Sequence, residues 1–279
     1  MGKSYEKDLT FDDWVSLVQI VIAKHARILK PGGFMVVNIA DILCFSDPLI
    51  PRIQAESLGK NRLPVTRDDI AGVLQEHPEY DRYRIAKVLG VSEQTVDRRM
   101  KHNNIRGGKS AAQTRVKLTG PLIADAAHKS GLFLYDRRVW VKDPCWENSR
   151  WHTNSYRAVD EFEYLYFFWK PGITKIDRKR LQNDEWASWG SRAVWRVPSV
   201  KANDDHEAKF PIELPRRVIR LLTDPGETVL DPFVGSGTTA VAAIQERRRF
   251  IGIDREPKYV NLAQLACEHA RGSLGERRG

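Results

Sequence analysis

Residues 229–240 read VLDPFVGSGTTA, the pattern of a buried strand that runs into a glycine-rich turn and then into a helix. Glycine adopts backbone angles that other residues avoid, and it lets a ligand approach the main chain closely. Asp254 follows Gly235 by 19 positions (254 − 235) and ends a second short apolar run, residues 250–253. A carboxylate at this distance can accept hydrogen bonds from both ribose hydroxyls of an adenosine cofactor. The stretch therefore predicts a cofactor pocket where two neighbouring strands end.

The spacing of the turn admits more than one cofactor. Gly235, Gly237 and Ala240 also satisfy the loose dinucleotide fingerprint, with Ala in the third place. The residues alone therefore leave NAD and S-adenosylmethionine both open, beside a structural turn that binds nothing. The acid at the expected distance favours a ligand.

The rest of the chain predicts an α/β fold around this turn. Residues 11–29 have apolar positions at helical spacing, stop at residues 30–33 (KPGG) and lead into a buried strand at 34–39. Further strands are expected at 132–135, 139–141, 161–169, 228–230 and 250–253, and further helices at 211–223, 238–247 and from 257. Residues 173–205 are expected to be irregular because they are polar. Alternation of helices and strands is typical of an α/β sheet.

Composition limits the class of protein. The 279 residues suffice for one catalytic domain and a small insert, and the net charge of +9 favours a polyanionic partner. The sequence has no apolar run of about 18 residues, and its N-terminal residues contain no apolar signal core. Cys44, Cys145 and Cys267 lie far apart, which argues against a disulfide framework and a structural zinc and favours a reducing cytoplasm. The seven histidines show no metal-ligand spacing, so we predict no metal.

Residues 69–102 resemble a helix-turn-helix. Helices are expected at Ile70–Gln75, Tyr83–Leu89 and Ser92–His102, with Gly90 in the turn. Ala86 is small enough for close helix approach, and Val96 is expected in the core. The candidate DNA contacts are Gln94, Thr95 and Arg98 in the last helix, with Arg99, Lys101, Arg106 and Lys109 suited to phosphates. A solvated basic face and a protein-contact unit are the alternatives.

Several segments together resemble the DNA amino-methyltransferases that modify N4 of cytosine or N6 of adenine. They are KFPIELP (209–215), DPFVGSGTT (231–239), GID (252–254), WGSRAVWRVP (189–198) and LKPGG (29–33). An NAD enzyme is not expected to share the Phe-Pro element of the first segment. The resemblance implies a Rossmann-like sheet that binds S-adenosylmethionine, in the β-type motif order. It favours N4 of cytosine, because residues 189–195 are similar to those members.

The resemblance also implies roles for individual residues. In this family Phe233 would wall the cofactor, the glycine turn would approach its methionine part, and Asp254 would hold the ribose. His206, Phe210 and Pro211 would cover the cofactor from the other side. The implied cofactor-binding set is Asp231, Phe233, Gly235, Ser236, Gly237, Thr238, Asp254, His206, Phe210 and Pro211. For Phe210 and Phe233 the alternative is plain core packing.

The catalytic motif of that family is not found. It reads Asp, Ser or Asn followed by Pro-Pro and an aromatic residue, and no Pro-Pro dipeptide occurs here. The tetrapeptide at 143–146 (DPCW) is the nearest imitation, but it stands at the wrong place in the order. Residues 2–6 resemble the continuation after that motif. We therefore expect an incomplete sheet without the neighbour of the strand ending at Asp231, and no activity of this chain alone.

The sequence thus predicts a methyltransferase domain of residues 1–44 and 118–279 and a helix-turn-helix insert of residues 67–110. Double-stranded DNA is the expected partner, in the cytoplasm of a prokaryote or phage, and a cognate restriction endonuclease is a further partner that the resemblance suggests. Two alternatives stay open: a helix-turn-helix DNA-binding protein with a vestigial cofactor fold, and an NAD-linked oxidoreductase.

Overall fold

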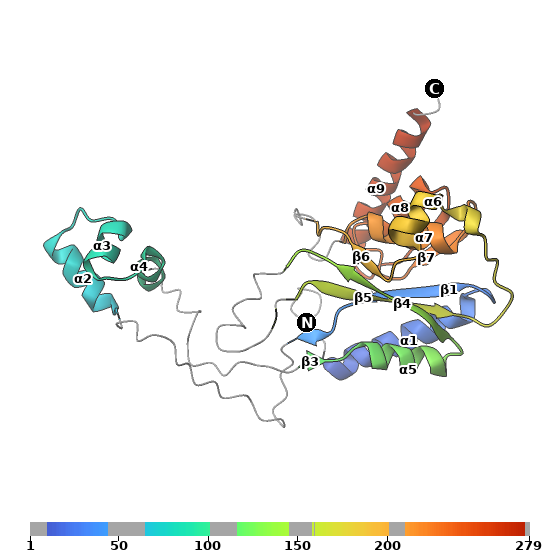
Figure 1. The fold of residues 1–279 in the computed structure, drawn as a ribbon, viewed down its shortest axis with the longest axis horizontal. Coiled ribbons are helices and arrows are strands. Elements are labelled where there is room, and N and C mark those ends of the chain that lie inside the picture. The colour runs from blue at the N-terminus through green and yellow to red at the C-terminus, as the bar shows by residue number, and fades with distance from the viewer. Residues whose placement is uncertain are drawn as a thin grey trace. The chain divides into compact units, whose positions relative to one another are not determined.

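The computed structural model describes residues 10–43, 65–100, 116–144, 158, 160–200 and 210–276. The chain divides into two compact units (Figure 1). The sheet unit contains residues 1–42, 117–144 and 161–279, and the helical unit contains residues 43–116 and 145–160. Within the described ranges, no helix is long and apolar enough to cross a membrane.

The sheet unit is a mixed α/β structure, as expected from the alternating pattern. Its elements are α1 (Phe11–Ile28), β1 (Phe34–Ile39), α5 (Gly120–Lys129), β4 (Phe133–Val141), β5 (Phe162–Trp169), η3 (Arg178–Arg180), α6 (Asn183–Glu185), η4 (Trp186–Gly190), β6 (Val194–Arg196), α7 (Glu213–Leu222), β7 (Thr228–Asp231), α8 (Thr238–Gln245), β8 (Arg249–Gly252) and α9 (Pro257–Glu276). The helical unit contains α2 (Arg67–Glu76), α3 (Arg82–Val88) and α4 (Glu93–Met100).

A four-stranded sheet in the order β1-β5-β4-β6 forms the middle layer of the sheet unit. β5 pairs antiparallel with β1 and with β4, so β1 and β4 run in the same direction. β4 and β6 pair in parallel. The carboxyl ends of β1, β4 and β6 therefore lie at one edge of the sheet.

Helices cover both faces of this sheet. Tyr166 and Phe168 of β5 pack on Ile22 of α1 and Ile123 of α5, on one face. The alternate residues of β5 face the other way and pack in a core with tryptophans and α7, comprising Leu165, Phe167, Trp140, Trp189, Trp195 and Leu214. Figure 1 shows α1 and α5 on one side of the sheet and α7 on the other. Burial on both faces explains why β5 reads as a continuous apolar run.

The two strands expected at 132–135 and 139–141 are one strand, β4, with an irregularity between Leu134 and Asp136. The polar residues between the expected strands suggested a break. Arg138 is nevertheless 8% exposed, because its Nη1 donates to the carbonyls of Trp189 (3.3 Å) and Gly190 (3.0 Å). Its guanidinium also lies over the ring of Trp195, 5.0 Å from the centroid. These partners allow the charged Arg138 side chain to be buried, so the strand continues through this residue.

Residues 173–205 were expected to be irregular, and this expectation is wrong for part of the segment. It contains η3, α6, the π-helical turn η4 and strand β6. Trp189 and Trp195 are 5% and 0% exposed, and they pack edge to face with 6.0 Å between ring centroids. The order comes from packing against β4 and α7, which local polarity does not reveal.

β7 and β8 form a separate parallel pair, with Asp231 opposite Gly252. One face of the pair is covered, because Ile219 of α7 and Ala242 of α8 pack with Phe250. Among the described residues, β7 pairs with β8 alone. The carboxyl ends of both strands lie at one edge, where the glycine turn begins.

The chain enters and leaves the stretch between β1 and α5 through a short strand pair, β2 (Ile42–Leu43) with β3 (Val116–Lys117). Beside this pair the fully buried Thr119 donates its N–H to Asp41 Oδ1 (2.9 Å) and its hydroxyl to the carbonyl of Ala40 (3.1 Å). We call β2, β3 and these hydrogen bonds the stem.

Ion pairs join the loop after β5 to the end of α7. Arg180 donates from Nε to Asp224 Oδ1 (2.8 Å) and from Nη2 to Oδ2 (3.2 Å), and Lys175 Nζ also donates to Oδ2 (2.8 Å). The Arg180 guanidinium first, and then the Lys175 ammonium, hold the pKa of Asp224 well below its usual value. Ionised Asp224 therefore stabilises the folded sheet unit.

We predict that Asp224→Asn lowers the free energy of unfolding at pH 7, and that this loss shrinks as the pH falls below about 4. The folded pKa lies below the unfolded one, so the carboxylate's contribution is complete above the unfolded pKa. It disappears as the pH falls through the folded pKa. Urea titrations at pH 7, 4.5 and 3 measure the difference.

Asp125→Asn is the matched control for this prediction. Asp125 pairs with Lys129 on α5, but its side chain is 53% exposed and the Lys129 side chain 70%, so its replacement should change stability little at any pH. A loss from Asp224→Asn that stays the same at all three pH values would contradict the prediction.

Candidate cofactor pocket and candidate DNA-binding unit

The glycine turn between β7 and α8 has a backbone that only glycine adopts easily. Gly235 has φ +51° and Gly237 has φ +93°. Gly237 is also the N-cap of α8, and a Cβ there would lie 2.9 Å from the Cα of Ala263 in α9. Both glycines are buried. The turn therefore brings its main chain to the edge where β7 ends, with no Cβ at Gly235 or Gly237.

Two carboxylates stand at this edge. Asp254 follows β8 and accepts the Gly235 N–H at Oδ2 (3.0 Å) and the Glu256 N–H at Oδ1 (2.9 Å). Asp231 ends β7 and accepts the Phe233 N–H at Oδ1 (2.9 Å). The bend and the acid predicted from the sequence thus lie within hydrogen-bond distance. Each carboxylate oxygen has a second lone pair, so Asp254 can still accept hydroxyl donors.

Apolar side chains flank these acids. Phe233 is 59% exposed, which is inconsistent with plain core packing of its ring. Ile253, directly before Asp254, is 51% exposed, and the sequence reading did not single it out. The signal in the sequence that could have identified Ile253 is an apolar residue between the end of a strand and an acid. Ser236 and Thr238 are half-buried at the start of α8. The edge therefore combines acceptors, exposed apolar surface and a helix N-terminus, which favours anionic groups.

The other predicted cofactor residues divide between described and undescribed parts of the chain. Phe210 packs against the tryptophan core of the sheet, which supports the core-packing alternative for this residue. Pro211 precedes α7 and is half-buried. His206 lies outside the described residues. A role of these three residues in covering a cofactor stays a prediction.

The helical unit has its own core. Ile70, Ile85, Ala86 and Val96 are at most 5% exposed and pack together. Gly90 has φ +64° and makes the bend between α3 and α4. The three helices lie where the sequence predicted them, to within a few residues at each end.

The predicted DNA contacts lie on and after α4. Gln94 is exposed. The Thr95 hydroxyl lies 2.9 Å from Ser92 Oγ, so part of the hydrogen-bonding capacity of Thr95 is used inside the helical unit. Arg99 is half-buried, and its carbonyl accepts from Arg67 Nε (3.0 Å). Further predicted contacts fall outside the described part, namely Lys101, Arg106, Lys109 and the side chain of Arg98.

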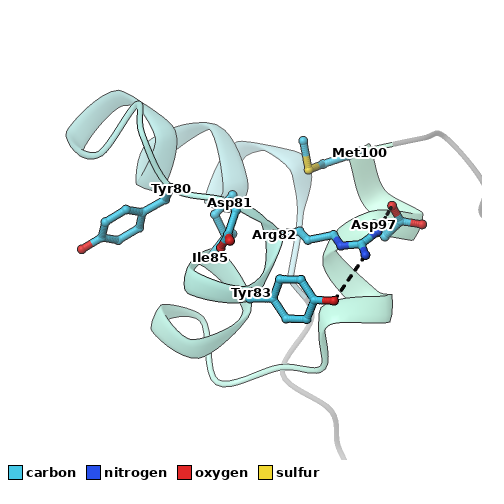
Figure 2. Close-up of a pocket in the computed structure, with 7 residues that line it drawn as sticks. All are labelled: Tyr80, Asp81, Arg82, Tyr83, Ile85, Asp97 and Met100. Carbon is cyan, nitrogen blue, oxygen red and sulfur yellow. Dashed lines mark hydrogen bonds and ion pairs between the residues drawn. The ribbon is translucent and has the colours of Figure 1, made fainter.

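The unit also presents a polar cluster that the sequence did not reveal. Arg82, at the start of α3, lies 2.9 Å from Glu93 and 3.7 Å from Asp97 of α4. Figure 2 shows Arg82 beside Tyr83 and Asp97 at the rim of a hollow that Met100 also lines. The residues are of common types and come from two different helices, so no motif marked them.

The tetrapeptide at 143–146, whose place in the motif order argues against a catalytic loop, begins just after β4. Asp143 Oδ2 accepts the Ser199 N–H (2.9 Å), and the Asp143 N–H donates to Ser199 Oγ (3.3 Å). Cys145 and Trp146 lie outside the described residues. These two hydrogen bonds join the end of β4 to the segment after β6, so Asp143 has a structural role. Among the described residues, no three His, Cys, Asp or Glu side chains cluster as metal ligands do.

Comparison with known structures places the fold. A DNA modification methylase from Thermus thermophilus, TTHA0409, solved in complex with S-adenosyl-L-methionine, superposes with a TM-score of 0.59 over 93% of this chain and 79% of that chain, at 20% identity. The cytosine-N4-specific PvuII DNA methyltransferase superposes with a TM-score of 0.53 over 95% of this chain and 74% of that chain, at 18% identity. At these identities the likeness concerns the fold alone.

Comparison of sequences places the family. The Type II methyltransferase M.BglI of Bacillus subtilis is 60% identical over 268 residues, which are 96% of this chain and 77% of that protein. M.Cfr9I of Citrobacter freundii is 34% identical over 143 residues, which are 50% of this chain and 46% of that protein. The model of the N6/N4-type DNA methylases matches residues 1–265. The chain therefore belongs to the DNA methylase family, and it is a DNA methyltransferase by descent.

Proposed function

We propose that this chain binds S-adenosylmethionine at the turn of residues 235–237 and belongs to an enzyme that methylates an exocyclic amino group in double-stranded DNA. The hydrogen bond between Gly235 N–H and Asp254 carries the proposal, since it joins the glycine bend and the acid in one pocket. Asp254 would accept the ribose hydroxyls, and Phe233 and Ile253 would supply apolar surface for the adenosyl group. The bound cofactor would supply the methyl group.

N4 of cytosine is the proposed acceptor, with N6 of adenine as the alternative. This choice depends on the resemblance of residues 189–195 to cytosine-specific members. The alternative of a DNA-binding protein with a vestigial cofactor fold is not favoured, because the family match extends across both units. The Type II label of M.BglI supports a companion restriction endonuclease, whose sites this protein would protect.

Asp254→Asn should weaken S-adenosylmethionine binding roughly tenfold or more, because hydrogen bonds to a charged group contribute about 1.5–3 kcal/mol. Asn keeps one oxygen that can accept the Gly235 N–H, but it loses the acceptor of the Glu256 N–H. Isothermal calorimetry measures the affinity, and a thermal melt checks the fold. Asp125→Asn, which removes an exposed carboxylate from α5, should leave binding unchanged. Binding of NAD by the parent chain, or equal affinity of both variants, would refute the pocket.

We propose further that residues 67–110 form a helix-turn-helix DNA reader inserted into a methyltransferase domain of residues 1–44 and 118–279. The buried Ala86 and Val96 and the bend at Gly90 support it. Arg98→Ala with Arg99→Ala should weaken duplex binding by roughly three- to tenfold at 0.1 M salt, because phosphate contacts release counterions. Gel shifts measure this, with Lys24→Ala plus Lys129→Ala in the sheet unit as the control. Equal shifts for both double variants would remove the assignment.

The chain has no Pro-Pro dipeptide, so the sequence supplies no motif to orient the amino group of the target base. We propose that these 279 residues alone bind cofactor and DNA without transferring the methyl group. Radiolabelled S-adenosylmethionine with bacterial genomic DNA should give background incorporation, and M.BglI serves as the positive control. Turnover above background by this chain would contradict the proposal.

A further inference from the structure

α4 carries two carboxylates in one row. Glu93 is its first residue, and Asp97 follows one turn later. Residues four apart on a helix are neighbours, so both acids share one stripe of its surface. The adjacent stripe begins with the exposed Gln94, which the sequence predicts as a DNA contact. Any nucleic acid that reaches Gln94 therefore passes close to both acids.

Arg82 spans this acidic row from the start of α3. Its Nε lies 2.9 Å from Glu93 Oε1, and its Nη1 lies 3.7 Å from Asp97 Oδ1. The remaining nitrogen, Nη2, donates to the Tyr83 hydroxyl at 3.4 Å, as Figure 2 shows. The planar guanidinium can hold several acceptors in fixed geometry, which an ammonium cannot do. One cation thus engages both turns of the acidic row.

The charge of the three helices makes this contact important. Residues 65–100 contain six basic and seven acidic residues, a net charge of −1. The three helices together therefore have no excess positive charge, whereas residues 101–115, which follow α4 in the sequence, contain four basic residues and no acidic one. A carboxylate without a counter-charge near phosphates is repelled, and at ordinary salt the repulsion acts over about 8–10 Å. Whether α4 can approach DNA thus depends on how its acids are paired.

We propose that Arg82 is a positioning residue for DNA recognition, which offsets Glu93 and Asp97 so that α4 can approach the phosphates. The inference rests on the proposed DNA-binding function of the helical unit. It differs from a direct phosphate contact by Arg82, because the effect of Arg82 then depends on the two acids. It also differs from a simple tie between α3 and α4, because that tie would affect folding and not the salt-dependent affinity.

A mutant cycle on the full chain tests the proposal, with a 30-base-pair duplex of mixed sequence as the probe. Arg82→Ala should lower affinity roughly three- to tenfold at 0.1 M salt and less at 0.5 M salt. Glu93→Gln with Asp97→Asn should restore most of this loss in the Arg82→Ala background. The same two neutral residues should give a smaller gain in the parent chain, where Arg82 already pairs both acids. Arg82→Lys should bind with intermediate affinity.

Arg84→Ala is the matched control, because Arg84 is an exposed cation of the same helix that lies over the Tyr80 ring. This variant removes one positive charge but leaves Arg82 paired with Glu93 and Asp97. Adding Glu93→Gln with Asp97→Asn to it should therefore raise DNA affinity only as much as in the parent chain. Thermal melts show whether each variant folds. Equal gains in all three backgrounds would overturn the role of Arg82. If Arg98→Ala with Arg99→Ala also leaves DNA binding unchanged, the DNA-reading function itself fails.

Discussion

The hydrogen bond from the Gly235 amide to the Asp254 carboxylate is the contact on which the arrangement of the pocket depends. A turn with two glycines at positive φ has backbone amides that no helix or strand satisfies, and a half-buried amide without an acceptor is costly. Asp254 satisfies one of them from the neighbouring strand. The same bond keeps the ends of β7 and β8 in register, with Asp231 opposite Gly252, and sets where α8 begins.

Much of this part of the fold could be predicted from the sequence, because the determining interactions are local. A short apolar strand, a glycine bend and an acid on the next strand occupy adjacent positions in the chain, and each limits the backbone of the next. The helical unit was predictable for a related reason. Ala86, Gly90 and Val96 are separated by a few residues, and each has a steric role that few other side chains can fulfil.

The errors concern residues whose environment is built from distant segments. Arg138 looked like a break between two strands, yet β4 continues through it because the carbonyls of Trp189 and Gly190 and the ring of Trp195 receive the cation. The same tryptophans lie in a segment that looked irregular by polarity. Neither periodicity nor motif spacing contains that information.

The stem of β2, β3 and the Asp41–Thr119 hydrogen bonds has an evolutionary consequence. It pairs the two points where the main chain departs from β1 and returns to α5, so both junctions are fixed whatever lies between them. Loop closure costs little more for a long excursion than for a short one. A recombination event at these junctions can therefore exchange the whole intervening module while the parent sheet keeps its packing.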